Sequence, residues 1–94
     1  MKIVWLPRSQ RDLKRSHDYI AQKSPSAARI VIERILTQVE LLGAFPVSGR
    51  VGRVTGTREL VISRTPYILA YRATNDRVEV LAVIHGKRRW PKGF

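Results

Sequence analysis

The sequence predicts an α+β fold with the element order β-α-α-β-β-β, in which a helical hairpin packs on one face of a mainly antiparallel sheet. Two segments in the first half repeat apolar residues three or four positions apart, as amphipathic helices do. Three later segments are rich in β-branched and aromatic residues and are separated by short breakers. A chain of 94 residues can bury one hydrophobic core but not two, so residues 1–94 are expected to form a single domain.

The first predicted elements are a short strand and a helix. Residues 2–6 form a β-rich run that ends at Pro7. Ser9 can cap the helix that follows, whose apolar positions include Leu13 and Ile20. The other faces of this helix carry several basic residues. We therefore expect it to lie at the surface with one narrow apolar stripe facing inward.

The second helix has a clear boundary signal at each end. Ser24 suits the N-cap, and Pro25 suits the first helical position, where its missing N–H has no partner to lose. Gly43 suits the left-handed residue past the helix end. A short polar turn near residues 22–24 would join the two helices in a hairpin. The broad apolar face of the second helix consists of Ala28, Val31 or Ile32, Ile35, Val39 and Leu42.

The second half of the chain predicts a surface loop and three strands. Residues 45–57 contain several glycines and no sustained periodicity, which indicates a loop. The strands are expected at residues 58–63, 67–73 and 78–84, with connections short enough for antiparallel hairpins. The last strand is apolar on both faces apart from Glu79, which favours a central position in the sheet. The sheet face away from the helices is expected to be open.

The charge balance indicates an anionic partner. Eighteen lysines and arginines stand against seven acidic residues, a net charge of +11, and 13 of the 18 are arginines. Arginine's planar fork matches phosphate and carboxylate groups two atoms at a time. Nucleic acid, an acidic protein segment and an acidic surface of a larger assembly all qualify. The half from Gly43 onward carries a net +7 and the first 42 residues a net +4, so the sheet and tail are the expected binding surface.

Composition also excludes several kinds of site. The chain has no cysteine, so no disulfide or thiolate zinc site can exist, and the cytoplasm is the simplest expectation for its location. Two isolated histidines and scattered carboxylates show no metal-ligand spacing, so we expect no metal. The glycines of residues 49–56 match no phosphate or dinucleotide loop, so we expect no cofactor. No apolar run is long enough for a membrane span.

The tail "HGKRRWP" holds the first set of candidate residues. His85 could act as a general base near neutral pH, or it could serve a structural or contact role because no second catalytic group lies nearby in sequence. Lys87, Arg88 and Arg89 stand beside Trp90, a combination of fixed positive charge and a flat ring that suits an anionic or stacked partner. Trp90 could equally anchor the tail on the core while the basic residues reach outward.

The second set of candidates lies on the predicted strands. The arginines could line one cationic face of the sheet, with tyrosines between them, and bind a partner or stabilise a transition state. Glu59 could neutralise one of them through a cross-strand pair. The set consists of Arg58, Arg64, Tyr67, Tyr71 and Arg72.

Several motifs together resemble the RelE/ParE superfamily of type II toxin–antitoxin toxins. They run from the opening "W-x-P" through "DL", "YIA", "SPSAA", "FPVSGR", "GTREL" and "TPYILAYR" to "VEVLAVIHGKRRWP". The resemblance covers almost the whole chain and implies the same β-α-α-β-β-β fold. It also implies a toxin that arrests bacterial growth, a role of the kind linked to plasmid stabilisation, and a cognate antitoxin as partner, often a small acidic protein whose flexible tail wraps the toxin.

Two activities divide the superfamily. RelE-type members are ribosome-dependent messenger RNA endonucleases, whereas ParE-type members poison DNA gyrase and are not enzymes. Ile68 stands where RelE-type chains carry an arginine, and Phe94 stands about where they carry a tyrosine or histidine. The "HG-x-R-x-W-P" ending looks like ParE-type chains. We therefore favour a gyrase poison over the alternative, a nuclease acting on ribosome-bound mRNA.

In the nuclease alternative, the catalytic residues would be Arg58, His85 and Arg88. Arg88 matches an arginine of the nuclease tail, which keeps this alternative open. A third possibility is a degenerate toxin that binds partners without arresting growth.

Overall fold

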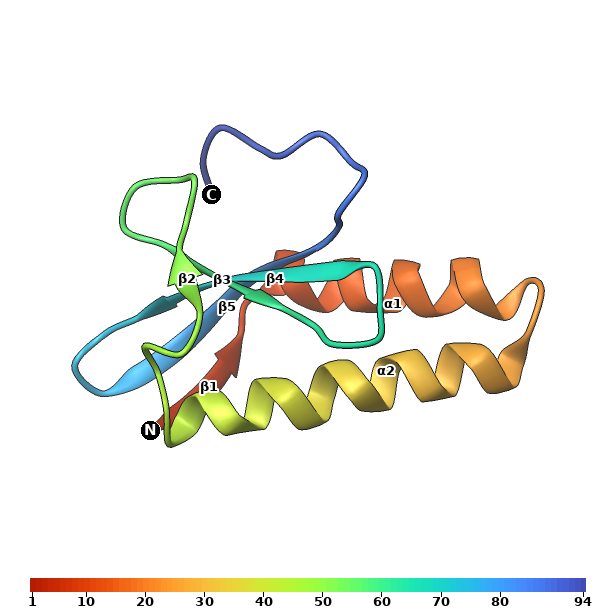
Figure 1. Cartoon of the computed structure of the whole chain (residues 1–94), viewed down its shortest axis with the longest axis horizontal. Coiled ribbons are helices and arrows are strands. Elements are labelled where there is room, and N and C mark those ends of the chain that lie inside the picture. Colours follow the sequence, from red (N-terminus) through yellow and green to blue (C-terminus); the bar gives the residue numbers. More distant parts are fainter.

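A computed structural model describes residues 1–94 of the chain as two helices packed against a five-stranded sheet (Figure 1). The predicted element order is confirmed, with one strand added, β2, inside the segment expected to be a loop. A run of two residues is too short to show periodicity, which is why the sequence did not reveal β2. The elements are β1 (Lys2–Trp5), α1 (Pro7–Ala21), α2 (Pro25–Glu40), the 3₁₀ turn η1 (Leu41–Gly43), β2 (Arg50–Val51), β3 (Arg58–Val61), β4 (Tyr67–Ala73) and β5 (Arg77–His85).

The sheet has the strand order β1-β5-β4-β3-β2. β5 lies in the interior of the sheet, as its two apolar faces predict, and every pairing except β1 with β5 is antiparallel. β1 pairs with only the first half of β5, from Lys2 opposite Arg77 to Trp5 opposite Val80. The second half of β5 therefore has no strand on that side.

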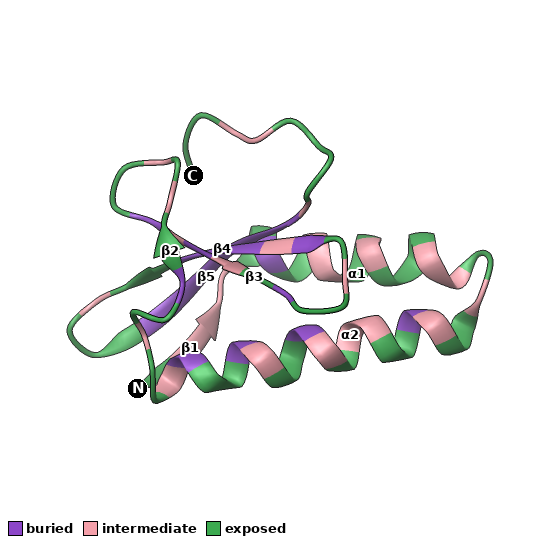
Figure 2. Cartoon of the chain, viewed as in Figure 1, coloured by how far each residue is buried: buried purple, intermediate pink, exposed green.

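The main core lies between the helices and one face of the sheet (Figure 2). Ile35 and Val39 of α2 are fully or almost fully buried against Leu69 and Tyr71 of β4 and Val80 of β5. Leu13 and Ile20 of α1 pack against the same cluster, as their helical spacing predicted. Burying each large apolar side chain of this kind contributes about 1.5–3 kcal/mol to folding.

Only one of the two predicted helix caps is confirmed. Ser24 caps α2, because its hydroxyl accepts a hydrogen bond from the Ala27 N–H at 3.1 Å. The cap at Ser9 is wrong, since α1 begins two residues earlier at Pro7. Ser9 is buried inside the first turn, and its hydroxyl donates to the Leu6 carbonyl at 2.7 Å. Proline fits the first position of a helix, and here it sets the start.

Glycine is required at residue 43 for a reason other than the predicted left-handed conformation. It is not left-handed, since Gly56 is the glycine with a positive φ. Instead, a Cβ at residue 43 would lie 2.8 Å from the Met1 carbonyl oxygen. The Met1 ammonium group donates to the Gly43 carbonyl at 2.6 Å. The glycine thus allows the chain's first residue to approach the end of the helical hairpin.

The second face of the sheet is not fully open, which corrects the sequence prediction. A smaller apolar cluster of Ala70, Leu81, Ala82 and Ile84 lies away from the main core, and Trp90 of the C-terminal tail packs on it. The tail, residues 86–94, arches over this side of the sheet (Figure 1). β5 is apolar on both faces, so its outer face also needs cover, and the tail provides part of it. Neither helix is long and apolar enough to cross a membrane.

Candidate functional site

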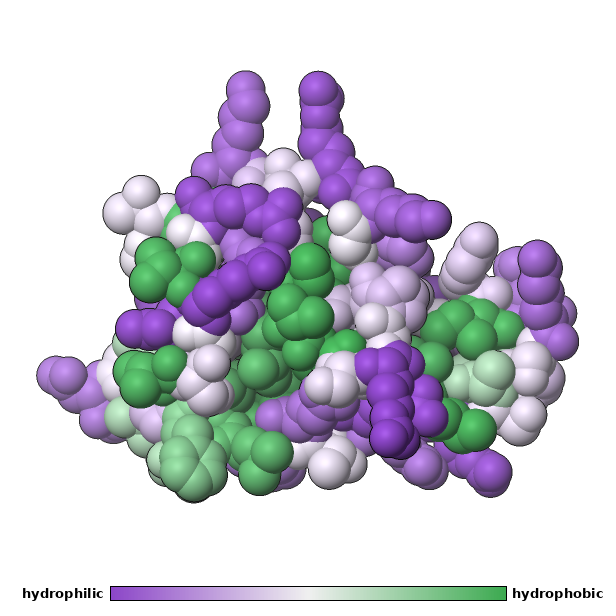
Figure 3. Space-filling view, viewed as in Figure 1, coloured by the Kyte–Doolittle hydropathy of each residue, from purple (hydrophilic) through white to green (hydrophobic).

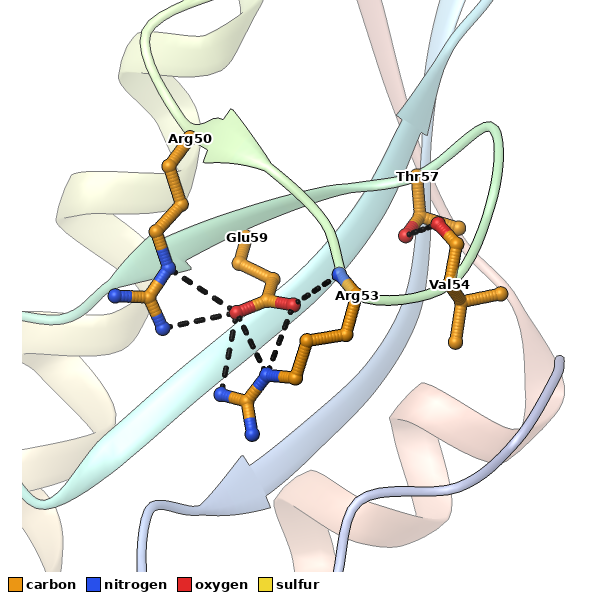
Figure 4. A network of polar contacts seen from close by, with 5 residues as sticks. All are labelled: Arg50, Arg53, Val54, Thr57 and Glu59. Carbon is orange, nitrogen blue, oxygen red and sulfur yellow. Dashed lines mark hydrogen bonds and ion pairs between the residues drawn. The ribbon is translucent and has the colours of Figure 1, made fainter.

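Two buried glutamates on the sheet hold four of the arginines. The Glu59 side chain on β3 accepts hydrogen bonds from Arg50 Nη2 at 2.9 Å, Arg53 Nη2 at 3.2 Å and the Arg53 backbone N–H at 2.8 Å (Figure 4). Glu59 is only 2% exposed. Burial by itself raises the pKa of this carboxyl, but the hydrogen bonds from Arg53 and Arg50 outweigh it and hold the pKa below its ordinary value.

Glu79 on β5 forms the second such group. Its carboxylate accepts hydrogen bonds from Arg72 Nη2 at 2.6 Å and from Arg77, and it forms an ion pair with each. The hydrogen bond from Arg72 is the main reason that the pKa of Glu79 is lowered, against the opposing effect of burial. Arg72 therefore has a structural partner within the chain.

The tail joins the Glu59 group through an aromatic contact. The Arg53 guanidinium lies 3.9 Å from the centroid of the Trp90 ring, a cation–π geometry. Trp90 is partly buried and its indole Nε1 is buried without a hydrogen-bond partner. Trp90 thus anchors the tail by packing, as one of the two sequence interpretations proposed.

Arg58 and Tyr71 hold the loop before β2. The Arg58 Nη1 donates to the Gly49 carbonyl at 2.9 Å. The Tyr71 hydroxyl donates to the Pro46 carbonyl at 2.8 Å and accepts from the Gly49 N–H at 2.9 Å. Burial raises the pKa of Tyr71. Both side chains thus fix a backbone segment.

The expected row of strand arginines on one face is wrong. Arg58 is paired with Tyr71, whose side chain belongs to the main core under the helices. Arg72 follows Tyr71 along β4 and so points to the opposite face. Arg64 lies in the turn between β3 and β4, with φ 63°, and its carbonyl accepts a hydrogen bond from Arg34. Arg64 thus lies outside the strands that carry Arg58 and Arg72.

Most of the remaining candidate residues lie together on a different surface. A groove of about 440 Å³ opens between α1, the end of β5 and the start of the tail. It brings together five residues that the sequence singled out, Tyr67, His85, Lys87, Arg88 and Arg89. It also has a wall that the sequence interpretation missed, formed by Arg8, Asp12, Arg15, Ser16 and Tyr19 of α1. Val83 and Ile84 complete the lining.

The short β1 strand explains how α1 comes to form this wall. The last β1-side hydrogen bond to β5 runs from the Leu6 N–H to the Val80 carbonyl. Beyond it, the Val83 N–H donates to Asp12 Oδ2 at 3.0 Å, so a helix side chain takes the place of a missing strand. The sequence signal that could have revealed the wall is the spacing of Arg8, Asp12, Arg15 and Tyr19, which places a second, polar stripe on one helical face.

The groove is strongly cationic. Asp12 is its one carboxylate, and it is engaged by the Val83 N–H and by Arg8, whose Nε lies 3.5 Å from Oδ2. Arg15, Lys87, Arg88 and Arg89 form no ion pair within the chain. Hydrophilic side chains project from the region of the tail at the top of Figure 3. Such an arrangement is suited to binding an anion.

His85 stands at the junction of β5 and the groove with its ring already engaged. Its Nδ1 lies 3.1 Å from the Lys87 backbone N–H and accepts a hydrogen bond from it. Its ring meets Tyr67 edge-on, with the centroids 5.5 Å apart and the planes at 77°. No group of three or more carboxylate or histidine side chains is placed to hold a metal ion.

Comparisons with known proteins agree on one family. The model of the ParE toxin of the type II toxin–antitoxin system parDE matches residues 3–90. The protein Y4kP of Sinorhizobium fredii is 44% identical over 91 residues, which is 97% of this chain and 94% of that protein. Toxin RelE2 of Caulobacter vibrioides is 34% identical over 87 residues, 93% of this chain and 97% of that protein. Toxin RelE3 of the same organism is 35% identical over 92 residues, 95% and 99% of the two chains.

A solved structure supports the same assignment. A chain described as the chromosomal ParDE toxin–antitoxin system from P. aeruginosa matches this fold with a TM-score of 0.81 at 26% identity, covering 90% of this chain and 95% of that chain. The relatives carry both ParE and RelE names, so they do not separate the two activities of the superfamily. They do confirm the resemblance seen in the sequence motifs. This chain belongs to the ParE toxin family of type II toxin–antitoxin systems, within the RelE/ParE superfamily.

Proposed function

We propose that this toxin arrests bacterial growth by binding and poisoning DNA gyrase in the cytoplasm, and that a cognate antitoxin neutralises it. The observation that carries the proposal is that the histidine and the one carboxylate of the cationic groove, His85 and Asp12, are already engaged. His85 Nδ1 accepts the Lys87 N–H, and Asp12 is held by Val83 and Arg8. A nuclease needs a base free to take a proton from the attacking hydroxyl. A binding surface needs only the fixed charges.

Two side chains that depart from RelE-type chains add support. Ile68 on β4 is paired with Ile84 and lies near Gly86, so an apolar side chain occupies this part of the outer face. Phe94 packs against Arg8, whose guanidinium carbon lies 5.5 Å from the ring centroid. Neither side chain can donate a proton or stabilise a phosphate. This pattern favours a toxin that acts by binding.

The decisive experiment adds the purified toxin to DNA gyrase and relaxed plasmid. We expect loss of supercoiling or accumulation of cleaved DNA bound to gyrase, and we expect antitoxin added beforehand to prevent it. A parallel reaction contains ribosomes and mRNA without gyrase. An unaffected gyrase together with ribosome-dependent cleavage of the message would reject the proposal.

The alternative function is a ribosome-dependent mRNA endonuclease of the RelE type. It is favoured by one observation, namely that His85, Arg88 and Tyr67 line the same groove. It predicts that His85→Ala or Arg88→Ala abolishes cleavage of mRNA on the ribosome. Arg58, the third residue of that hypothesis, lies outside the groove and binds the Gly49 carbonyl.

The antitoxin is expected to cover exposed apolar surface as well as charge. Phe45, Val47 and Val51 are more than half exposed, with Val51 79% exposed at the edge strand β2. Apolar side chains also gather toward the lower left of Figure 3, over the end of α2 and the segment that follows. A disordered antitoxin segment that folds on contact gains from such burial.

A further inference from the structure

We propose that the cationic groove between α1 and the tail binds the sugar–phosphate backbone of DNA, so that the toxin contacts the DNA held by its target as well as the target protein. The inference deepens the proposed function and rests on it for its biological setting. The inference that the toxin binds DNA is argued from the groove alone and does not depend on the identity of the target.

The distribution of paired and unpaired arginines is the first argument. On the sheet, Arg50 and Arg53 are matched by Glu59, and Arg72 and Arg77 by Glu79. The fields of those four cations are therefore largely cancelled at close range. In the groove, Arg15, Lys87, Arg88 and Arg89 have no such partner, and Asp12 is shared with Arg8. Four cations without an ion pair therefore line this one opening.

The geometry of the two walls is the second argument. Arg8 and Arg15 lie seven residues apart on the same face of α1, about 10 Å along the helix axis at a rise of ~1.5 Å per residue. Measured along the axis of a DNA duplex, where each strand carries one phosphate per ~3.4 Å, that separation spans about three base-pair steps. Lys87, Arg88 and Arg89 supply cations from the facing wall. A phosphate strand running through the groove would meet charge on both sides.

The groove is also held in place before any ligand arrives. The Asp12 carboxylate ties α1 to the Val83 N–H of β5. At the other wall, the Arg88 N–H donates to the His85 carbonyl at 2.9 Å and the Lys87 N–H donates to the His85 ring. These bonds fix the backbone that carries the cations. Little ordering of the protein backbone would therefore oppose binding.

The lining favours a nucleic acid over an acidic protein segment. A protein segment that folds on binding needs exposed apolar anchors, but Val83 and Ile84 in the groove are each only 5% exposed. The exposed apolar side chains of residues 45–51 lie outside the groove. Tyr19 lines the groove and is 69% exposed, which leaves a hydroxyl and a ring available to a phosphate or a base.

The test measures binding of the full-length toxin to a fluorescein-labelled 20-base-pair DNA duplex by anisotropy over a range of salt concentrations. The groove variant is Arg15→Gln with Arg89→Gln. The control is Lys23→Gln with Arg29→Gln, which removes the same charge from exposed, unpaired residues outside the groove. We expect the groove variant to lose about tenfold or more in affinity, with a slope of log K against log salt reduced by about 2. The control should stay within about twofold of wild type.

Each other outcome has a defined meaning. An equal loss in both variants would show attraction to net charge alone and overturn the groove assignment. If a polyglutamate peptide binds the groove more tightly than DNA does, the ligand is an acidic protein segment and the DNA assignment is overturned. If RNA of the same length binds clearly more tightly than the DNA duplex, DNA is likewise overturned as the ligand. Circular dichroism verifies that both variants are folded.

Gyrase inhibition separates this inference from the proposed function. If wild-type toxin does not inhibit gyrase but groove-dependent DNA binding holds, the gyrase proposal fails and the groove assignment stands. If the groove variant loses DNA binding but inhibits gyrase as wild type does, the gyrase proposal stands, and the contact with target-held DNA is overturned.

Discussion

At the scale of single residues, Gly49 shows how closely the loop before β2 is packed. The residue is buried, and a Cβ there would lie 2.7 Å from the Tyr71 ring and hydroxyl and 2.8 Å from the Glu59 carbonyl. The same loop is bound by Tyr71 and Arg58. Both the steric fit and these hydrogen bonds depend on the absence of a side chain at residue 49.

We predict that Gly49→Ala lowers the free energy of unfolding by about 1–3 kcal/mol, because overpacking must displace Tyr71 or the β3 backbone. Urea unfolding of the two proteins measures the change. Gly93→Ala is the matched control, since no atom lies within 4 Å of a Cβ at that position. Equal stability of the two variants would contradict the close packing of the loop.

Some residue roles could be predicted from sequence and others could not. The cap at Ser24 follows from local chemistry, because the hydroxyl and the N–H that it accepts are three residues apart. The need for glycine at residues 43 and 49 comes from the close approach of Met1 and Tyr71, respectively, which are distant in sequence. A glycine in the sequence can indicate a position where a side chain is not tolerated. It does not indicate which distant residue packs against that position.

At the scale of elements, the tail packs on the outer face of the sheet through the Trp90 ring, and its last residue, Phe94, contacts Arg8 of α1. Trp90 packs on the outer cluster and against Arg53, while Lys87, Arg88 and Arg89 are exposed. Because Trp90 Nε1 makes no hydrogen bond, the anchoring comes from the area of the ring. The orientation of the groove's tail wall should therefore depend on an aromatic side chain at this position.

We predict that Trp90→Ala releases the tail and speeds trypsin cleavage after residues 87–89 by about tenfold, since local opening exposes the backbone to protease. Limited proteolysis followed by mass spectrometry of the fragments measures the rate. Trp90→Phe is the control and should stay close to wild type, because it keeps most of the ring contact. Cleavage of Trp90→Ala at the wild-type rate would show that the tail is held elsewhere.

The elements were predictable to different degrees. β4 begins and ends where the sequence pattern predicts, and β5 extends one residue further at each end. The helical spacing of the polar α1 residues indicates a polar stripe, but its place beside β5 could not be predicted, because it depends on β1 ending halfway along β5. The prediction of a single cationic sheet face was wrong because of the strand register. Arg58 is paired with Tyr71, whereas Arg72 follows Tyr71 along β4, so the two arginines lie on opposite faces of the sheet.

At the scale of the whole molecule, the two buried glutamates link stability to pH. The pKa values of Glu59 and Glu79 are lowered in the folded protein. A carboxyl with a lowered folded-state pKa contributes stability that is fully present above its ordinary value of 4.5 and is lost as the pH falls through the folded-state pKa.

We therefore predict that the toxin is most stable near neutral pH and loses stability as the pH falls below 4.5. Urea midpoints between pH 7 and pH 3 measure this loss. Glu59→Gln should be less stable than wild type at neutral pH by about 1–3 kcal/mol, because the arginines lose a charged acceptor, and it should show a shallower loss in acid. Glu40→Gln, at an exposed residue without an ion pair, should follow the wild-type curve. An unchanged acid profile for Glu59→Gln would contradict this link.

The parallel pairing of β1 with β5 has a consequence for synthesis on the ribosome. Lys2 is made among the first residues, but its partner Arg77 follows only after most of the chain. At translation rates of about 5–20 residues per second, this delay is about 4–15 s. During that time the nascent chain can form its helical hairpin but not its complete sheet or the groove beside β5. We therefore expect the groove, and any binding that depends on it, to form only when synthesis of the chain is nearly complete.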